Sequence, residues 1–143
     1  MPVHAIHHFN IRAAQRELVG LRDFYCRVVG LEPGPRPPFR SAGFWLYADG
    51  EPVLHLTEAP ETEFLPPVGE RRSAADHIAF RASDLQATLT RLRESGIPWT
   101  IDTVPNLHEI QVFFQDPSGV GVELNFNSRI ERSAAMQDSG NPA

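Results

Sequence analysis

The feature that most constrains the fold of this chain is an internal repeat. The segment HHFNIRA aligns with DHIAFRA, which pairs His8 with His77 at an offset of 69 residues. The segment FWLYADGEPVLHLTE aligns with VFFQDPSGVGVELNF, which pairs His55 with Glu123 at an offset of 68 residues. Two separate segments with nearly the same offset indicate a duplicated module, so we expect two similar halves.

Each copy of the module has the predicted order β-α-β-β-β. Strand segments lie between turn-forming residues, and helical segments carry apolar residues at helical spacing. In the first copy we expect a strand at 3–12, a helix at 16–29, an irregular proline-rich stretch at 32–39, and strands at 43–47 and 52–58. In the second copy we expect strands at 76–82, 97–103, 110–114 and 119–126, and a helix that begins with a capping box of Ser83 and Gln86.

These elements predict an α+β fold with one domain at 1–127, made of the modules 3–58 and 76–127. The segment 59–75 contains three prolines and mixed charges, which is typical of a linker. Residues 128–143 are mostly small and polar, and we expect them to form a flexible tail.

The composition excludes several classes of function. The net charge is -5 and no basic stripe is present, which argues against binding of nucleic acid. No apolar run reaches the roughly 18 residues of a membrane span, and no secretory signal is recognisable at the N-terminus. The single cysteine, Cys26, excludes an internal disulfide and fits a reducing cytoplasm.

Four side chains that suit metal binding stand at repeat-equivalent positions. His8 and His77 lie on the first predicted strands of the two copies, and His55 and Glu123 lie on the last. Polar groups among apolar strand residues are costly unless they are paired or bind a metal. Imidazole and carboxylate suit a divalent ion such as Zn, Ni, Co, Mn or Fe(II). Because strand residues alternate between faces, His8 is expected to point into the site and His7 away from it.

The order of these motifs resembles the vicinal oxygen chelate superfamily, which includes glyoxalase I, extradiol dioxygenases, methylmalonyl-CoA epimerase, and fosfomycin- and bleomycin-resistance proteins. The resemblance covers 3–127 and rests on HHFNI with the later LRDFYCRVVGLEPG, on DHIAFRASDL and on FFQDPSGVGVELNF. It implies two modules that form a cup-shaped, partly open eight-stranded mixed sheet around a metal site. It also implies that His8, His77 and Glu123 are metal ligands, with His55 at the position of the fourth.

One implied reaction is that of a glyoxalase I-like lyase or isomerase, which acts through a metal-stabilised enediolate. In that reaction Glu123 acts as the base, and His55 is either the fourth ligand or a second base. Arg12 stands where glyoxalase I has an arginine for the carboxylate of glutathione, so glutathione is a candidate co-substrate. Against this reaction, Ala59 replaces the asparagine that binds glutathione in those enzymes.

Two alternatives use the same cup. In an Fe(II) extradiol dioxygenase, which cleaves catechol rings, His8, His77 and Glu123 bind iron and His55 is an acid-base group beside it. Phe113 stands where those enzymes have a tyrosine. In a bleomycin-resistance type protein the cup binds a ligand without reaction, and the metal ligands are generally missing.

Further residues are candidates for the substrate pocket. Trp45 and Phe113 align in the repeat, and each precedes a candidate ligand by ten residues. Arg36 lies in the proline-rich stretch, where it is a candidate for an anionic substrate, and His108 lies in the loop VPNLHEI. Arg12 belongs to the same group, and packing or surface roles remain open for all five. The resemblance implies a homodimer that binds a small molecule with two vicinal oxygens, with each site built from one chain or from two.

Overall fold

The computed structural model describes residues 5–62, 77–104 and 107–132. The chain divides into two compact units, Met1–Arg71 and Arg72–Ala143. The division falls inside the segment expected to be a linker. Within the described ranges, no helix is long and apolar enough to cross a membrane.

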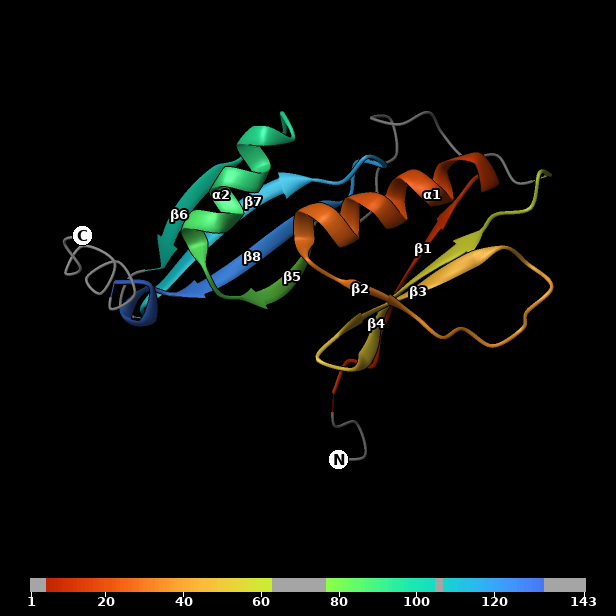
Figure 1. Cartoon of the computed structure of the whole chain (residues 1–143), viewed down its shortest axis with the longest axis horizontal. Coiled ribbons are helices and arrows are strands. Elements are labelled where there is room, and N and C mark those ends of the chain that lie inside the picture. Colours follow the sequence, from red (N-terminus) through yellow and green to blue (C-terminus); the bar gives the residue numbers. More distant parts are fainter. Residues whose placement is uncertain (1–4, 63–76, 105–106, 133–143) are drawn as a thin grey trace, which may run out of the picture. The chain divides into compact units, whose positions relative to one another are not determined.

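The first unit is a four-stranded mixed sheet with a helix packed against one face. Its elements are β1 (Phe9–Ala13), α1 (Gln15–Phe24), the π-helical segment η1 (Tyr25–Val29), β2 (Glu32–Gly34), β3 (Gly43–Ala48) and β4 (Glu51–Glu58). The strand order is β1-β4-β3-β2, in which β1 runs parallel to β4 and the other pairs are antiparallel (Figure 1).

The second unit repeats this topology. Its elements are β5 (His77–Ala82), α2 (Leu85–Glu94), β6 (Thr100–Val104), β7 (Glu109–Gln115) and β8 (Gly121–Asn127). The strand order is β5-β8-β7-β6, again with a parallel pair between the first and last strands of the module. The predicted duplication, the α+β class and the eight strands in mixed sheets are thereby confirmed.

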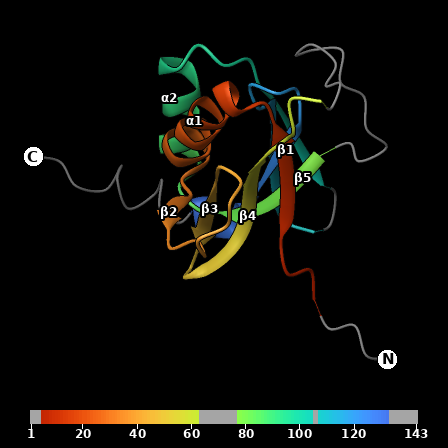
Figure 2. The same ribbon diagram turned by 90° about the vertical axis from the view of Figure 1, so that its right-hand side faces the viewer.

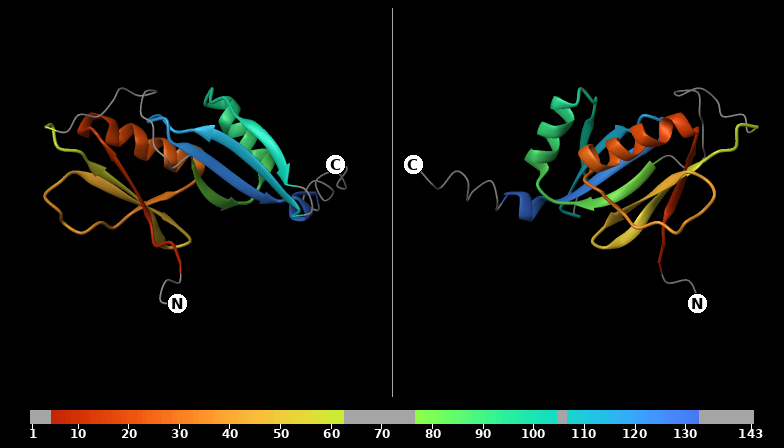
Figure 3. Two further views of the ribbon diagram at one scale, coloured as in Figure 1. Left: turned by 180° about the vertical axis from the view of Figure 1, so that it is seen from behind. Right: turned by 45° about the vertical axis from the view of Figure 1, so that its right-hand side comes forward.

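Alternation along the strands separates a core face from an open face in each sheet. In the first unit α1 contacts β3 and β4, and Figure 2 shows it on one side of the sheet. Leu46, Leu54 and Leu56 are fully buried on that side. In the second unit α2 lies against one face of its sheet (Figure 3) and buries Leu92. The residues that alternate with these core positions point to the other face.

The proline-rich stretch 32–39 is not wholly irregular as predicted, because its first three residues form β2. This strand lies at the edge of the sheet, and Pro33 is paired with Leu46. Proline is tolerated there because an edge strand can leave one side without hydrogen bonds. The hydroxyl of Tyr47 also donates to the carbonyl of Pro35 at 2.6 Å, which holds the following loop.

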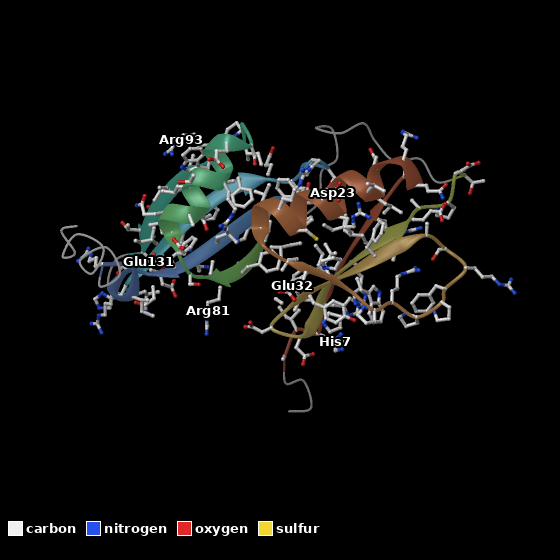
Figure 4. The ribbon with its side chains drawn as sticks, viewed as in Figure 1. His7, Asp23, Glu32, Arg81, Arg93 and Glu131 are labelled. Atoms are coloured by element: carbon white, nitrogen blue, oxygen red, sulfur yellow. The ribbon has the colours of Figure 1, made fainter. Side chains whose placement is uncertain are left out.

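Helix α2 begins differently from its predicted capping box. Its N-cap is Asp84 rather than Ser83, and the Asp84 side chain accepts a hydrogen bond from the N–H of Ala87 at 3.0 Å. The carboxylate of Glu131 accepts two more, from the N–H groups of Asp84 and Leu85 at 3.0 and 2.9 Å. Figure 4 shows Glu131 at this end of the helix. A tertiary contact therefore replaces the local one.

The contact with Glu131 also concerns the predicted tail. Residues 128–132 form a helical turn after β8, and the side chain of Asn127 accepts the N–H of Arg129 at 3.0 Å. These bonds fix the first residues of the segment expected to be flexible. Residues 133–143, and most of the predicted linker, lie outside the described residues.

The hairpin between β7 and β8 depends on a buried carboxylate in the motif DPSG. Asp116 accepts hydrogen bonds at 2.8 Å from the N–H and hydroxyl of Ser118 and from the N–H of Val120. Gly119 follows in the left-handed region at φ 87°, where glycine has no steric penalty. The aspartate of this motif therefore shapes the turn that leads into β8 and Glu123.

Candidate functional site

In the first unit three rings form a stack. The antiparallel register places Trp45 directly opposite His55, and their rings are parallel with centroids 4.1 Å apart. His8, directly before β1, stacks on the other side of His55 at 3.9 Å. The parallel pairing of β1 with β4 brings these residues together. The prediction that His8 lies on the face of His55 is consistent with this contact.

His55, at the centre of the stack, is only 8% exposed. Burial and then the charge of His8 lower the pKa of its imidazole below the ordinary 6.5, against a hydrogen bond to the backbone of Pro52 that raises it. Its Nε2 atom is buried and has no hydrogen-bond partner within the described part of the chain. His55 therefore offers a neutral imidazole with an unused lone pair.

In the second unit the equivalent positions carry a contact between an imidazole and a carboxylate. Nε2 of His77 lies 2.8 Å from Oε2 of Glu123. The other oxygen, Oε1, accepts hydrogen bonds from the side-chain amides of Gln111 at 2.7 Å and Asn125 at 2.6 Å. Glu123 is 5% exposed, so the carboxylate is buried and its orientation is fixed.

A shallow pocket of about 270 Å³ opens beside this pair. Phe113 lies opposite Glu123 in the sheet, and its ring meets His77 edge-on at 5.9 Å. The residues that line the pocket are His77, Phe113, Phe114, Gln115, Gly121 and Val122. Phe113 thus lies at the candidate ligands of its own unit, as Trp45 does in the other.

Arg36 belongs to the ring cluster of the first unit. Its guanidinium carbon lies 4.9 Å from the centre of the Phe39 ring, which in turn lies 6.3 Å from that of Trp45. Nη2 of Arg36 donates to the hydroxyl of Ser41 at 3.3 Å. The charge of Arg36 also acts on His55 and contributes to lowering its pKa.

Arg12 and His108 lie elsewhere in their units. Arg12 is exposed on β1, opposite Thr57 of β4. His108 is exposed in a turn with a positive φ of 56°, and its Nε2 lies 2.7 Å from Nη2 of Arg129. Its carbonyl accepts the N–H of Ser128 at 2.8 Å, so His108 anchors the C-terminal turn.

The expectation that His7 points away from the site rested on strand alternation, which does not describe this pair of histidines. Nδ1 of His7 lies 2.7 Å from Nδ1 of His8, and the rings meet edge-on at 5.0 Å. The reason is that β1 begins only at Phe9, later than predicted, so strand alternation does not apply to these histidines. Figure 4 shows His7 beyond the start of β1.

Three residues that contact the candidate site were missed in the sequence. Gln111 and Asn125 stand two strand positions from Phe113 and Glu123, so alternation alone places them on the same face. Phe39 lies in a loop without periodicity, where no such signal exists.

The side chains of His8, His55, His77 and Glu123 carry nitrogen and oxygen atoms of the kind that bind a divalent metal. Each unit supplies two of these side chains. Metal binding requires a neutral imidazole, and the lowered pKa of His55 favours that form. The buried Nε2 of His55 has no hydrogen-bond partner among the described residues, so its lone pair could bind a metal. Across the described ranges, no group of three or more His, Cys, Asp or Glu side chains is placed to hold a metal.

Comparison with known proteins identifies the family. The sequence profile of the Glyoxalase/Bleomycin resistance protein/Dioxygenase superfamily matches residues 5–124. No curated protein matches the sequence.

Solved structures share the fold at low identity. A protein assigned to the glyoxalase family of Bacillus anthracis is 23% identical with a TM-score of 0.65, over 87% of this chain and 96% of that chain. An antibiotic binding protein, TnmS3 of Streptomyces sp. CB03234, is 23% identical with a TM-score of 0.61, over 90% and 99%. A lactoylglutathione lyase of Agrobacterium tumefaciens is 23% identical with a TM-score of 0.62, over 90% and 98%. With its duplicated module and this match, the chain belongs to the Glyoxalase/Bleomycin resistance protein/Dioxygenase superfamily.

Proposed function

We propose that the chain is a metal-dependent enzyme with lyase or isomerase chemistry of the glyoxalase I type. The observation that supports this best is the pair of polar donors at the same place in each module. His8 and His55 meet in one, and His77 and Glu123 meet in the other. We propose that His8, His77 and Glu123 hold one divalent ion, drawn from Zn, Ni, Co, Mn and Fe(II), and that His55 is either its fourth ligand or a base.

A divalent ion held by these side chains would supply a Lewis acid for the oxygens of the substrate. Side chains of the protein then transfer the proton that leaves the substrate. His55 is neutral near pH 7, because its pKa is lowered, and it can accept a proton from a carbon next to a carbonyl group. Its burial between two rings excludes water from that nitrogen.

Glu123 is the second group that can exchange a proton. Its Oε1 accepts hydrogen bonds from the amides of Gln111 and Asn125, and its Oε2 contacts Nε2 of His77, so a proton would be exchanged at Oε2 once His77 turns to the metal. The two amides hold the carboxylate in one orientation while the proton moves. Arg12, exposed on β1, is proposed to bind a carboxylate of glutathione as co-substrate.

Metal content and two assays test this proposal. The protein is purified without chelators, its metal is measured, and it is assayed for thiol-dependent methylglyoxal consumption with Ni, Co or Zn. We expect turnover that stops in His8→Ala. Oxygen uptake with catechols and Fe(II) instead identifies an extradiol dioxygenase. Ligand binding without metal, unchanged in His8→Ala, identifies a binding protein and contradicts the proposal.

His55→Gln separates the two roles of His55. If His55 is a ligand, the variant loses metal as well as turnover. If His55 is a base, the variant retains metal and loses turnover alone. Unchanged turnover excludes both roles.

We further propose that the enzyme is a homodimer of the cytoplasm. Sedimentation at the mass of one 16.0 kDa chain contradicts the dimer. Mixing His8→Ala with Glu123→Gln then tells how sites are built. If each site combines modules of two chains, the mixed dimer regains one intact site and activity returns. If each site uses one chain, it does not.

A further inference from the structure

The two modules differ in one respect that the repeat makes visible. In the second, Glu123 brings a negative charge into a group of polar donors. In the first, the same position holds His55, whose imidazole brings no negative charge. The donors around the two positions can therefore be compared residue by residue.

Gln111 and Gly43 are equivalent in the sheets. Gln111 is paired with Asn125 beside Glu123, and Gly43 is paired with Thr57 beside His55. Gln111 donates from its amide to the carboxylate. Gly43 has no side chain to do so, and the guanidinium of Arg36 lies beside it instead.

The space at Gly43 is occupied by Arg36. A Cβ on Gly43 would lie 3.2 Å from Nη2 and 3.3 Å from Cζ of Arg36, and it would clash with the carbonyl oxygen of Leu56. A cation from the loop between β2 and β3 has thus taken the place that an amide has in the other module.

The charge of Arg36 is not compensated within the described residues. There it contacts the hydroxyl of Ser41 and the ring of Phe39, and neither carries a negative charge. Its Nε atom is buried and has no hydrogen-bond partner there. A guanidinium is always protonated, and its N–H groups match the two oxygens of a carboxylate. The cluster therefore has cationic donors and lacks an anion.

Two aromatic rings lie next to this cation, tilted by 48° to each other. Phe39 is 54% exposed, so it leaves apolar ring surface open to a ligand. Trp45 lies between it and the stacked His55. Planar groups stack on such rings, and a carboxylate on a planar group would reach the arginine at the same time.

We infer that Arg36 binds the carboxylate of the substrate, and that the carboxylate is attached to a planar apolar group that lies on Phe39 and Trp45. The substrate anion pairs with Arg36 in the first module, as the Glu123 carboxylate pairs with Gln111 in the second. This inference rests on the proposed function only in calling the ligand a substrate. It names the substrate class, an aromatic or otherwise unsaturated carboxylic acid.

Binding without turnover tests the inference separately from the enzyme activity. The full-length chain, as purified and after dialysis against a chelator, is titrated with benzoate, with uncharged benzamide and with inorganic phosphate. The indole N–H of Trp45 is followed by NMR and assigned with Trp45→Phe. We expect saturable binding of benzoate in both preparations, and binding of benzamide and phosphate that is weaker by about tenfold or more.

Substitutions of Arg36 test its role in binding benzoate. Arg36→Gln should lower the affinity for benzoate by about tenfold or more. Arg36→Lys retains the charge but not the bidentate donor, so it should lower the affinity less. Arg40 is an exposed arginine of the same loop, so Arg40→Gln should leave the affinity for benzoate unchanged. Retained benzoate affinity in folded Arg36→Gln overturns the inference. So does equal affinity of the wild-type chain for benzoate and benzamide, equal affinity for phosphate, or no saturable benzoate binding. Loss of metal or turnover with benzoate binding intact contradicts the proposed function alone.

Discussion

Oε2 of Glu123 lies 2.8 Å from Nε2 of His77, and Oε1 of the same carboxylate accepts two amide hydrogen bonds. The carboxylate is therefore held by three side chains on three strands, β5, β7 and β8. Such outer contacts orient a metal ligand and set its affinity. The predictions below begin with this network.

Gln111→Leu removes one of the two amide donors and leaves Glu123 in place. We expect affinity for Co(II) or Zn(II) to fall by about 10–100-fold, because a ligand that is not held in orientation binds less well. Isothermal titration with the metal measures the change. Gln86→Leu on α2 is the matched control, because Gln86 is exposed and lies outside the candidate site. Equal losses in both variants would contradict a positioning role.

His55 should make stability depend on pH. Its pKa is lowered in the folded state, so the unfolded chain takes up a proton more readily around pH 6.5. The free energy of unfolding should therefore decrease as pH falls from 6.5 towards the lowered pKa, and this contribution is complete above 6.5. Urea unfolding above and below pH 6.5, with a chelator present, measures this pH dependence of the free energy of unfolding. His55→Gln should reduce the slope, and an unchanged slope would exclude His55 as its source.

Asp116→Ala should destabilise the second unit. The change leaves the buried N–H and hydroxyl donors of Ser118 without their acceptor, at a cost of about 2 kcal/mol or more. Asp116→Asn retains one acceptor oxygen and should cost less. Urea unfolding monitored by circular dichroism measures the difference. Asp102→Ala, at an exposed position, is the control and should change stability by less than about 0.5 kcal/mol.

Glu131→Ala should loosen the start of α2. The loss of two accepted N–H hydrogen bonds at a helix N-terminus costs about 1 kcal/mol. Amide hydrogen exchange at Leu85 should increase, and Glu131→Gln should show a smaller effect because it retains an acceptor. If exchange at Leu85 is the same in all three chains, the capping role is wrong.

The sequence predicted those parts of the fold that have a period or a repeat. Strands β3, β4, β7 and β8 alternate clearly and lie within two residues of their predicted ends. The nearly equal offsets of 69 and 68 residues made His8 the counterpart of His77, and His55 the counterpart of Glu123. The structure brings His8 into contact with His55, and His77 into contact with Glu123.

Features that depend on tertiary contacts were not predictable in this way. The N-cap of α2 is fixed by Glu131, which is more than forty residues away in the sequence. The position of Arg36 follows from a loop whose conformation has no period. The metal-binding roles of the four candidate residues stay predictions until the titrations are made.

The parallel pairing of β1 with β4, and of β5 with β8, has a consequence for how the chain folds. In each module the first strand to be synthesised can find its place only after the last strand of that module exists. Contacts between residues so distant in the chain form late and slow the search, since loop closure precedes any gain in energy. The His8–His55 and His77–Glu123 contacts should therefore be among the last to appear during refolding.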